Sequence, residues 1–503
     1  MAEQKRRISV EHIDVEDPKI KSRNLWFYPL GTVGRDMVYN MFTSFIYLYV
    51  LYTKELTDSQ IVAITMIMVA ARVFDGFNDP IMGNIIERTR TKWGKFKPWL
   101  LAGVLSTSVV LYLAFNSGLT GWAFVTFFGV IYFMYSITYT MNDISYWGMV
   151  PALSRSSDTR NQFTSRTTLF AGIGGTLAGL MIPMFTAGTL QIGGNASTAY
   201  GVIALVIAVL CPLFILFTLL GVRENRDDME KPAEKISFRL ILDTIFGNDQ
   251  LRWMVLIFLL QQIGNSIVIG GIGANYVYFR YGYEGGLYSL FSTVGVAATA
   301  FLMLFYPAIS RKLKRKEFMK VLCYIASAGY ILMIVSGVVM PAAMPAFWVL
   351  TIGYMLSAFG MYGFYLVMMI SIFNTVEYNE LTKGKRCEGI ITSIRPFITK
   401  LSSAVVVMIT SLCYLLFRVT DYTNKIAGLE QSANQNLITT EIKNAEIDKV
   451  ISMVENGQTS GMLLFMTIVP FAMLLASYFL YIRFYKLDEE KYAEIVRELE
   501  QKR

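Results

Sequence analysis

Apolar runs of about 20 residues or more recur along the whole chain, and short polar segments separate them. A helix of that length is long enough to cross the hydrocarbon core of a bilayer. The pattern therefore predicts an all-α membrane protein with twelve transmembrane helices. We expect these helices near residues 31–53, 60–86, 98–116, 122–149, 167–187, 200–221, 254–280, 286–309, 319–340, 346–373, 390–417 and 461–484.

A long charged segment lies between the sixth and seventh runs and divides the predicted helices into two groups of six. The first helix of each group carries polar residues, and the loop between the second and third helices of each group is basic. Two six-helix halves around a binding site near the middle of the bilayer describe the major facilitator fold. We expect a cytoplasmic N-terminal tail (1–24), an N-terminal half (25–221), a cytoplasmic central loop (222–252), a C-terminal half (253–484) with an external segment (419–459), and a cytoplasmic C-terminal tail (485–503).

Lysine and arginine residues gather in alternate loops. The N-terminal tail and the segments after the second and eighth helices are basic, whereas residues 116–122, 187–198 and 337–345 contain no lysine or arginine. Because cytoplasmic loops of membrane proteins carry the excess of positive charge, both termini are predicted to be cytoplasmic. The net charge of +8 therefore reflects topology and does not indicate a nucleic-acid partner.

The amino-acid composition excludes several other classes of protein and several kinds of site. With 54% hydrophobic and 16% charged residues, the chain is not an ordinary soluble protein. The four cysteines form no CxxC pair, so neither a disulfide framework nor a zinc site is indicated. The only histidine, His12, lies in the N-terminal tail, which excludes a histidine-based metal site or proton relay, and no cleavable signal peptide is visible. In the external segment, apolar residues at helical spacing predict a short helix, to which we assign no chemistry.

The second predicted helix carries charged residues in an otherwise apolar stretch. Asp75 and Asp79 are four residues apart and share one face of a helix, and Arg72 can reach the same face. A carboxylate inside a membrane costs about 2.5–3.5 kcal/mol, so both acids need a partner or a counter-ion. The pattern leaves two interpretations open, which are a structural salt bridge to Arg72 and a cation site.

The end of the fourth helix carries polar and aromatic residues at helical spacing. Tyr139 and Thr140 lie four and three residues before Asp143. Trp147 follows Asp143 by four residues, so these side chains share one side of the helix. Carboxylate and hydroxyl oxygens suit a hard cation, whereas an indole beside a carboxylate suits a sugar. An anchor at the membrane surface remains the alternative for the tryptophan.

Other charged residues also fall inside predicted helices. Arg35 and Asp36 are adjacent in the first helix, so they point in different directions and are not expected simply to pair with each other. Either one of them faces the cavity while the other faces a neighbouring helix, or both are interfacial anchors near the helix end. Arg166 opens the fifth helix. Lys400 lies inside the eleventh helix, where a lysine is costly unless it faces a cavity or an acid.

The basic segment after the second helix is predicted to act in gating. We expect Arg88, Arg90 and Lys95 to dock on the cytoplasmic ends of neighbouring helices when the protein faces outward. Solvated surface charge is the alternative explanation for each acidic candidate partner. These candidate partners are Glu377, Glu380 and Glu388.

Three segments resemble the glycoside–pentoside–hexuronide:cation symporter family, which contains the bacterial melibiose carrier. They are DGFNDPIMG followed by RTRTKWGKFKPW, YTMNDISYWGMVP, and EYNELTKGKRCEGIITSI. The resemblance covers nearly all of the membrane part of the chain. The chain departs from the melibiose carrier in two places: the segment 152–165 is slightly shorter, which weakens the match of Arg166, and the carrier lacks the segment 419–459.

The resemblance implies specific roles for these residues. It places the coupling cation, Na+ or H+, at Asp75, Asp79, Asp143 and Thr140. The resemblance does not decide the ion; we favour Na+ and keep H+ as the alternative. It makes Arg35 and Asp36 an acid–base pair that binds sugar hydroxyls, makes Trp147 a stacking platform, and places Lys400 near the cation. The expected substrate site comprises Arg35, Asp36, Tyr139, Asp143, Trp147, Arg166 and Lys400.

We therefore expect cation-coupled symport of a sugar or glycoside across the cytoplasmic membrane by alternating access. A sodium-dependent lysolipid carrier is the closest alternative, because it shares the fold and part of the cation motif. A membrane enzyme or sensor is disfavoured, because the polar loops supply no nucleophile–base pair and no metal cluster. The expected protein is a monomer in membrane lipid with no cofactor other than the coupling ion. Neither the sugar nor the ion follows from the sequence.

Overall fold

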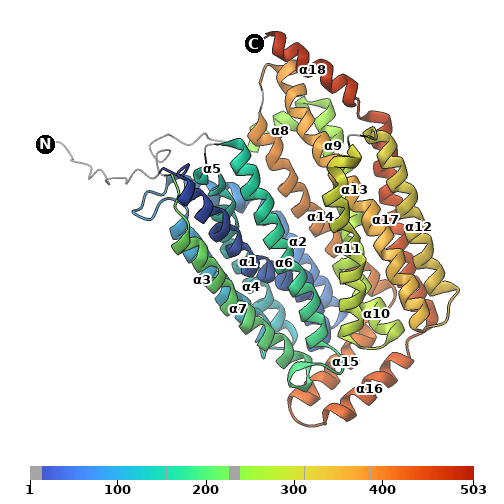
Figure 1. Cartoon of the computed structure of the whole chain (residues 1–503). Coiled ribbons are helices and arrows are strands. Elements are labelled where there is room, and N and C mark those ends of the chain that lie inside the picture. The colour runs from blue at the N-terminus through green and yellow to red at the C-terminus, as the bar shows by residue number, and fades with distance from the viewer. Residues whose placement is uncertain (1–13, 155, 226–237, 311, 386, 503) are drawn as a thin grey trace.

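The computed structural model describes residues 14–154, 156–225, 238–310, 312–385 and 387–502, and this part of the chain is a bundle of long helices (Figure 1). The N-terminal half occupies the blue-to-green side of the bundle in Figure 1. Its elements are α1 (Pro18–Thr53), α2 (Asp58–Arg88), α3 (Lys97–Phe115), α4 (Gly121–Gly148), α5 (Val150–Leu153), α6 (Ser157–Thr186), the 3₁₀ turn η1 (Ile192–Gly194) and α7 (Ala196–Gly221).

The C-terminal half lies beside the N-terminal half and contains a helix of π type in its first crossing. It also contains two short helices between its last two crossings and a helix at the end of the chain. Its elements are α8 (Phe238–Gly247), α9 (Asp249–Ile267), η3 (Val268–Ile272), α10 (Gly273–Tyr281), α11 (Gly285–Ser310), α12 (Arg315–Val338), α13 (Met344–Lys383), α14 (Glu388–Leu416), α15 (Val419–Asn434), α16 (Thr440–Ser452), α17 (Asn456–Phe484) and α18 (Glu489–Lys502).

The helices confirm the predicted fold class. Within the described residues, 11 segments are long and apolar enough to cross a membrane, and they match eleven of the twelve predicted crossings. The remaining crossing is α1, a helix of 36 residues in which Asp36, Asn40 and several tyrosines lower the hydropathy. Twelve helices in two six-helix halves therefore agree with the major facilitator fold.

Several helices extend beyond their predicted bounds, and α1 and α13 show why. The helix α1 begins at Pro18, inside the predicted tail, because the Asp17 side chain accepts hydrogen bonds from the first free N–H groups of the helix. Proline suits this position because it has no N–H to leave unpaired. The helix α13 continues to Lys383 and ends at Gly384, whose φ of 68° is the left-handed conformation that stops a helix. Hydropathy does not detect these polar turns because they lie outside the apolar stretch.

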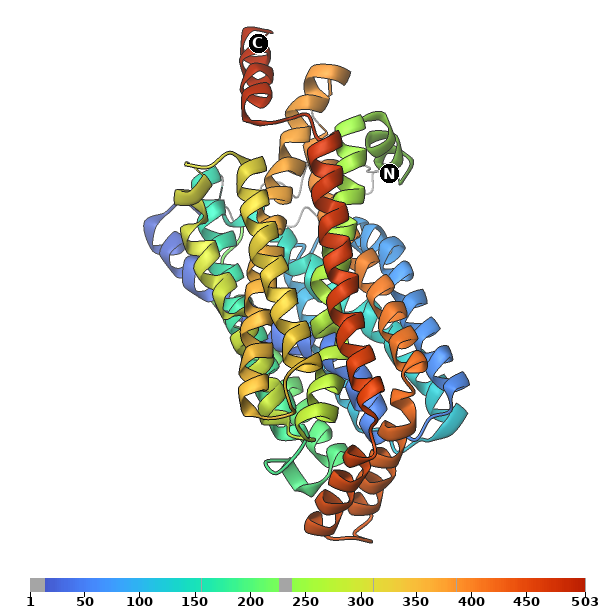
Figure 2. The same cartoon turned by 90° about the vertical axis from the view of Figure 1, so that its right-hand side faces the viewer.

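The bundle has two distinct ends. The helix α18 and the first described residues lie at one end, which we call the terminal end, and α15 and α16 lie at the other end (Figures 1 and 2). We call α15 and α16 together the cap. The predicted short helix in the segment 419–459 is α16, whereas α15 was not expected, because its apolar positions are few.

The predicted C-terminal tail contains α18, which binds the basic turn before α12. The Arg315 N–H and the Arg315 Nε donate to the same oxygen of Glu489, over 2.8 and 2.9 Å, and Lys314 pairs with Glu490 over 2.8 Å. Burial acts to raise the pKa of the Glu489 carboxyl, but hydrogen bonds from Arg315 outweigh it and lower that pKa. The basic turn is therefore partly neutralised by the end of its own chain.

Candidate functional site

Two glycines bring α1 against its neighbours. A Cβ atom at Gly34 would lie 2.6 Å from the Cα of Cys211 on α7, and one at Gly31 would lie 2.2 Å from the hydroxyl of Thr218. At Gly34 the close atom belongs to the backbone, so no larger residue fits there without moving a helix; at Gly31 the Thr218 side chain would have to move. The glycines therefore allow the close packing that buries the next residue, Arg35, inside the bundle.

Arg35 joins two carboxylates from different helices. Its Nη1 donates to Asp143 on α4 over 2.8 Å, and its Nη2 and Nε donate to Asp36 over 2.9 and 3.2 Å. The Thr32 hydroxyl also donates to Asp36, over 3.1 Å. The expectation that adjacent Arg35 and Asp36 would not simply pair is therefore wrong. The long arginine side chain folds back to its neighbour while its other nitrogen reaches across to α4.

Two aromatic rings face the Arg35 guanidinium. Its central carbon lies 5.0 Å from the ring centre of Tyr146 and 5.4 Å from that of Trp147. A guanidinium over an aromatic face is stabilised by the ring electrons. Trp147 is half-buried beside the charged cluster, which favours the cavity interpretation over a membrane anchor. Tyr139 lies about two turns before Tyr146 and Trp147 on α4, with its ring centre 5.6 Å from that of Tyr39.

A second polar cluster lies between α2, α4 and α14. Asp79 pairs with Lys400 of α14, and the Thr140 hydroxyl donates to Asp79 over 3.1 Å. One turn away, Asp75 accepts a hydrogen bond from Ser136 and lies 3.8 Å from Arg72. The pairs 75–136 and 79–140 repeat at a spacing of four residues on both helices, as expected when two helices run side by side.

The contact between Asp79 and Lys400 crosses the two halves of the protein. The residues are 321 positions apart in sequence, and α2 and α14 belong to different halves. About 30% of the Asp79 side chain and 27% of the Lys400 side chain remain exposed, and 36% of Asp143 is exposed. The protein therefore covers these charged groups only in part and does not seal them in its core.

The three predicted cation ligands do not share one partner. Asp75 binds Ser136 and Arg72, Asp79 binds Thr140 and Lys400, and Asp143 binds Arg35. Among the described residues, no group of three or more His, Cys, Asp or Glu side chains is placed to hold a metal ion. Their joint role as a Na+ site therefore stays a prediction.

Arg166 lies away from the other predicted substrate residues. Its Nη1 donates to the Leu25 carbonyl over 3.3 Å, and its guanidinium lies 5.0 Å from the ring centre of Trp26. Leu25 precedes Arg35 by ten residues on α1, which corresponds to about 15 Å along a helix. A substrate contact of Arg166 stays a prediction.

The predicted gating residues lie at the terminal end. Lys95 pairs with Glu87 over 2.6 Å, and Arg90 donates to the Glu87 carbonyl over 2.6 Å. These contacts hold the basic segment on its own half of the protein. Arg88 is exposed at the end of α2. The half-buried Glu377 and Glu380 lie near the end of α13, and Glu388 opens α14.

Some polar residues of the site were missed because they carry no charge. Ser136 lies one turn before Thr140 and binds Asp75, and Thr32 lies one turn before Asp36 and binds it. Each lies four residues before a predicted site residue, and residues four apart share a helix face, so this spacing could have identified both. Tyr146 was missed because it lies among many similar aromatic residues.

Known sugar transport proteins are similar to this chain. A family model described as MFS/sugar transport protein matches residues 27–489. A lactose permease of Lactobacillus helveticus is 28% identical over 400 residues, which cover 75% of this chain and 60% of that protein. A raffinose carrier protein of Pediococcus pentosaceus is 26% identical over 490 residues, which cover 94% of this chain and 70% of that protein.

The chain thus spans 60% of the length of the Lactobacillus helveticus relative. Among solved structures, a bacterial homologue of the human lysosomal transporter Spinster, inward-facing and occupied, is similar with a TM-score of 0.60 and 14% identity. That similarity covers 93% of this chain and 97% of the other. At this identity it concerns the fold alone.

Proposed function

Because this chain belongs to the MFS/sugar transport protein family, we propose that it carries a sugar or glycoside across the cytoplasmic membrane together with Na+ or H+. The central observation is the set of ion pairs inside the bundle, one of which, Asp79–Lys400, is partly exposed and joins the two halves. Intramembrane charges of this kind mark substrate and ion pathways. Relatives named permease and carrier support a transporter rather than an enzyme.

Arg35, Asp36 and Trp147 form the proposed sugar site. A carboxylate accepts two hydrogen bonds from neighbouring hydroxyls, and a guanidinium donates several in fixed directions. The indole offers an apolar face to the sugar ring. This combination favours a sugar over a lysolipid. The relatives named for lactose and raffinose support a glycoside of more than one sugar unit.

The charges of the two clusters favour a neutral sugar and a single monovalent cation. The clusters hold four carboxylates and three basic side chains, so one negative charge is left over. An anionic substrate would be repelled unless a cation bound first. One Na+ or one proton would cancel the excess. The carboxylates are Asp36, Asp75, Asp79 and Asp143, and the basic residues are Arg35, Arg72 and Lys400.

Asp79 is the proposed point at which the cation acts. Na+ would take oxygen from Asp79 and Thr140, in keeping with the preference of hard cations for oxygen ligands. A proton on the same carboxylate would remove its charge. Either event would release Lys400, and with it the link between α2 and α14. Cation binding would thereby loosen the contact between halves that must move against each other.

We expect sugar affinity to depend on the cation. Removing Na+ while raising the pH should leave the excess negative charge in place and weaken sugar binding about 5- to 150-fold, which is the range of typical coupling energies of 1–3 kcal/mol. Titration of the purified protein with lactose or raffinose, with and without Na+ at two pH values, measures this. Equal affinities under all conditions would mean that the two sites are not coupled.

Counterflow of labelled glycosides in membrane vesicles tests the transport activity itself. Vesicles loaded with unlabelled lactose or raffinose should take up the labelled sugar transiently above its outside concentration. Vesicles without the protein are the control. No counterflow with any glycoside would refute the proposed sugar transport.

The structure is closed at the cap end, where buried hydrogen bonds join the halves. Tyr52 of α1 donates to Asn275 of α10 over 2.6 Å, and Ser289 of α11 donates to the Leu180 carbonyl of α6 over 2.7 Å. The basic loops favour a cytoplasmic terminal end. This conformation then has its external side shut, and alternating access requires these contacts to separate.

The basic segment after α2 is proposed to dock across the halves in the opposite conformation, onto acids near the ends of α13 and α14. We expect the reversal of charge in Lys95→Glu to stabilise the conformation open to the terminal end, since the new acid would repel Glu377 and Glu380. Labelling of a cavity cysteine from the two sides should therefore shift several-fold toward the cytoplasmic side. Lys92→Glu, at an exposed position of the same loop, is the control. Unchanged labelling would count against the docking.

A further inference from the structure

The cap is attached to one half of the protein and packs on the other. It lies between α14 and α17 of the C-terminal half, at the lower end of the bundle in Figures 1 and 2. Its side chains nevertheless bind the N-terminal half. Asn424 accepts from the Leu56 N–H over 2.9 Å and donates to the Leu56 carbonyl over 2.8 Å, and Gln431 donates to the Thr53 carbonyl over 3.0 Å.

A buried ion pair lies at the centre of this contact. Glu430 of α15 and Lys443 of α16 approach to 3.3 Å, and both side chains are 0% exposed. Burial raises the pKa of the Glu430 carboxyl and lowers the pKa of the Lys443 ammonium. Such a pair is stable only when further hydrogen bonds satisfy both partners.

The N-terminal half supplies those further hydrogen bonds. The Ala196 N–H donates to Glu430 over 2.7 Å, and Gln191 donates to the other carboxyl oxygen over 3.1 Å. Lys443 donates to the Gly194 carbonyl over 2.8 Å and also binds Gln191. The pair is therefore satisfied only while the cap lies on the loop between α6 and α7.

The loop is shaped for this contact by two adjacent glycines. Gly193 and Gly194 have φ angles of 69° and 72°, which is the left-handed region that side chains disfavour. A Cβ atom at Gly194 would lie 2.5 Å from the hydroxyl of Thr440 on α16. Glycine thus allows both the turn and the close approach of the cap.

We propose that the cap is a latch that holds the two halves together at the external side and must detach each time that side opens. The proposal rests on the alternating access proposed above. The charged residues make the latch releasable, because Glu430 and Lys443 become hydrated when the cap lifts, whereas an apolar pair would resist exposure to water. The hydrogen bonds to Gln191, Gly194 and Ala196 make the closed position specific.

Substitution of the pair tests the latch without transport of any sugar. A reporter cysteine is introduced by Tyr39→Cys on α1, where the tyrosine is 39% exposed, in a chain in which Cys387→Ser removes the half-buried native thiol. A membrane-impermeant maleimide is then added from the external side. Lys443→Met leaves Glu430 buried without its cation, so the cap should detach and labelling should be at least threefold faster.

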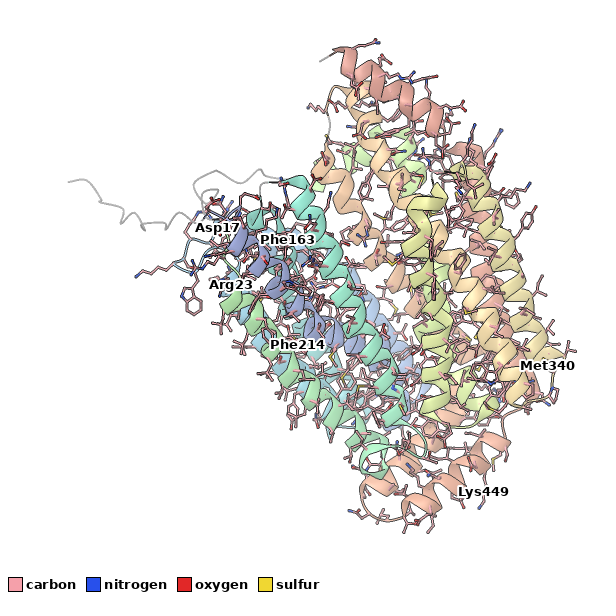
Figure 3. The ribbon with its side chains drawn as sticks, viewed as in Figure 1. Asp17, Arg23, Phe163, Phe214, Met340 and Lys449 are labelled. Carbon is pink, nitrogen blue, oxygen red and sulfur yellow. The ribbon has the colours of Figure 1, made fainter. Side chains whose placement is uncertain are left out.

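Two further variants separate the latch from general damage to the cap. Glu430→Leu combined with Lys443→Met leaves no unpaired charge but removes the hydrogen bonds to Ala196 and Gly194, so labelling should be faster than in the parent chain and slower than in Lys443→Met. Lys449→Met is the matched control, because Lys449 (Figure 3) lies on the same helix but is exposed and pairs with Glu446 of that helix. Unchanged labelling rates in Lys443→Met and in the double variant would overturn the proposal.

A reversible cross-link provides the second measurement. Leu56→Cys and Asn424→Cys place one thiol on each side of the contact that the Asn424 side chain makes with the Leu56 backbone. Oxidation should lower external labelling of the reporter at least tenfold, and reduction should restore it. Unchanged labelling in the cross-linked protein would refute the latch even if sugar transport is demonstrated. If the protein shows these labelling changes but transports no sugar, the latch is supported and only the proposed substrate is refuted.

Discussion

Replacement of Asp79 by asparagine is expected to abolish accumulation of sugar against its gradient while sugar binding and exchange persist. The amide cannot take up a proton and is a poor ligand for Na+, so the cation no longer acts on the contact between α2 and α14. Lys400 also loses its acid. Breaking a buried ion pair costs about 3–5 kcal/mol, and the partial exposure of both residues reduces that cost here.

Uptake and counterflow in the same vesicles measure the two activities separately. Uphill uptake driven by an imposed Na+ or H+ gradient should fall to the background, and counterflow should remain. Asp79→Asn combined with Lys400→Met leaves no unpaired charge and should be as stable as the parent chain but still uncoupled. Glu494→Gln removes an exposed carboxylate of α18, outside both charged clusters, and should leave accumulation intact. Accumulation at the parental level in Asp79→Asn would contradict the assignment.

Replacement of Arg35 by methionine is expected to weaken sugar binding at least 100-fold, or about 2.7 kcal/mol. The substitution leaves Asp36 and Asp143 near each other without the cation that now holds both in place. Arg35→Lys keeps the charge but loses the forked geometry, so an intermediate loss is expected, since the two residues are not interchangeable at such sites. Equilibrium binding of labelled lactose or raffinose measures the affinity.

A second arginine of α1 provides the control for this substitution. Arg23 lies near the terminal end of the helix, where its Nη2 donates to the Leu220 carbonyl over 3.1 Å (Figure 3). Arg23→Met should leave sugar affinity within about twofold of the parent. Parental affinity in Arg35→Met, or an equal loss in Arg23→Met, would show that Arg35 is not part of the sugar site.

The sequence predicted the membrane crossings well. It also predicted which faces of α2 and α4 carry the polar residues. Runs of apolar residues report burial in lipid directly, and a spacing of four residues reports a shared helix face. These local rules placed Asp75 and Asp79 of α2 on one face, and Thr140 on a face of α4 that the structure brings against Asp79. They also placed a helix in the external segment.

Contacts between distant helices were less predictable. The pairing of Asp79 with Lys400 depends on how the two halves meet, and no local pattern carries that information. The pairing of Arg35 with its neighbour Asp36 depends on side-chain rotamers, which helix geometry alone does not decide. No chemistry was assigned to the external segment from the sequence, because its charged residues Glu430 and Lys443 are of types common on exposed helices and show their burial only in three dimensions.

Gradient-driven uptake into proteoliposomes tests the central claim most directly. Purified protein is reconstituted, and uptake of labelled lactose and raffinose is followed with an inward Na+ gradient, an inward H+ gradient, or neither. Accumulation above the outside concentration is predicted with one of the two gradients and should collapse when a matching ionophore is added. Uptake that never exceeds equilibrium with either gradient, for either sugar, would contradict cation-coupled symport.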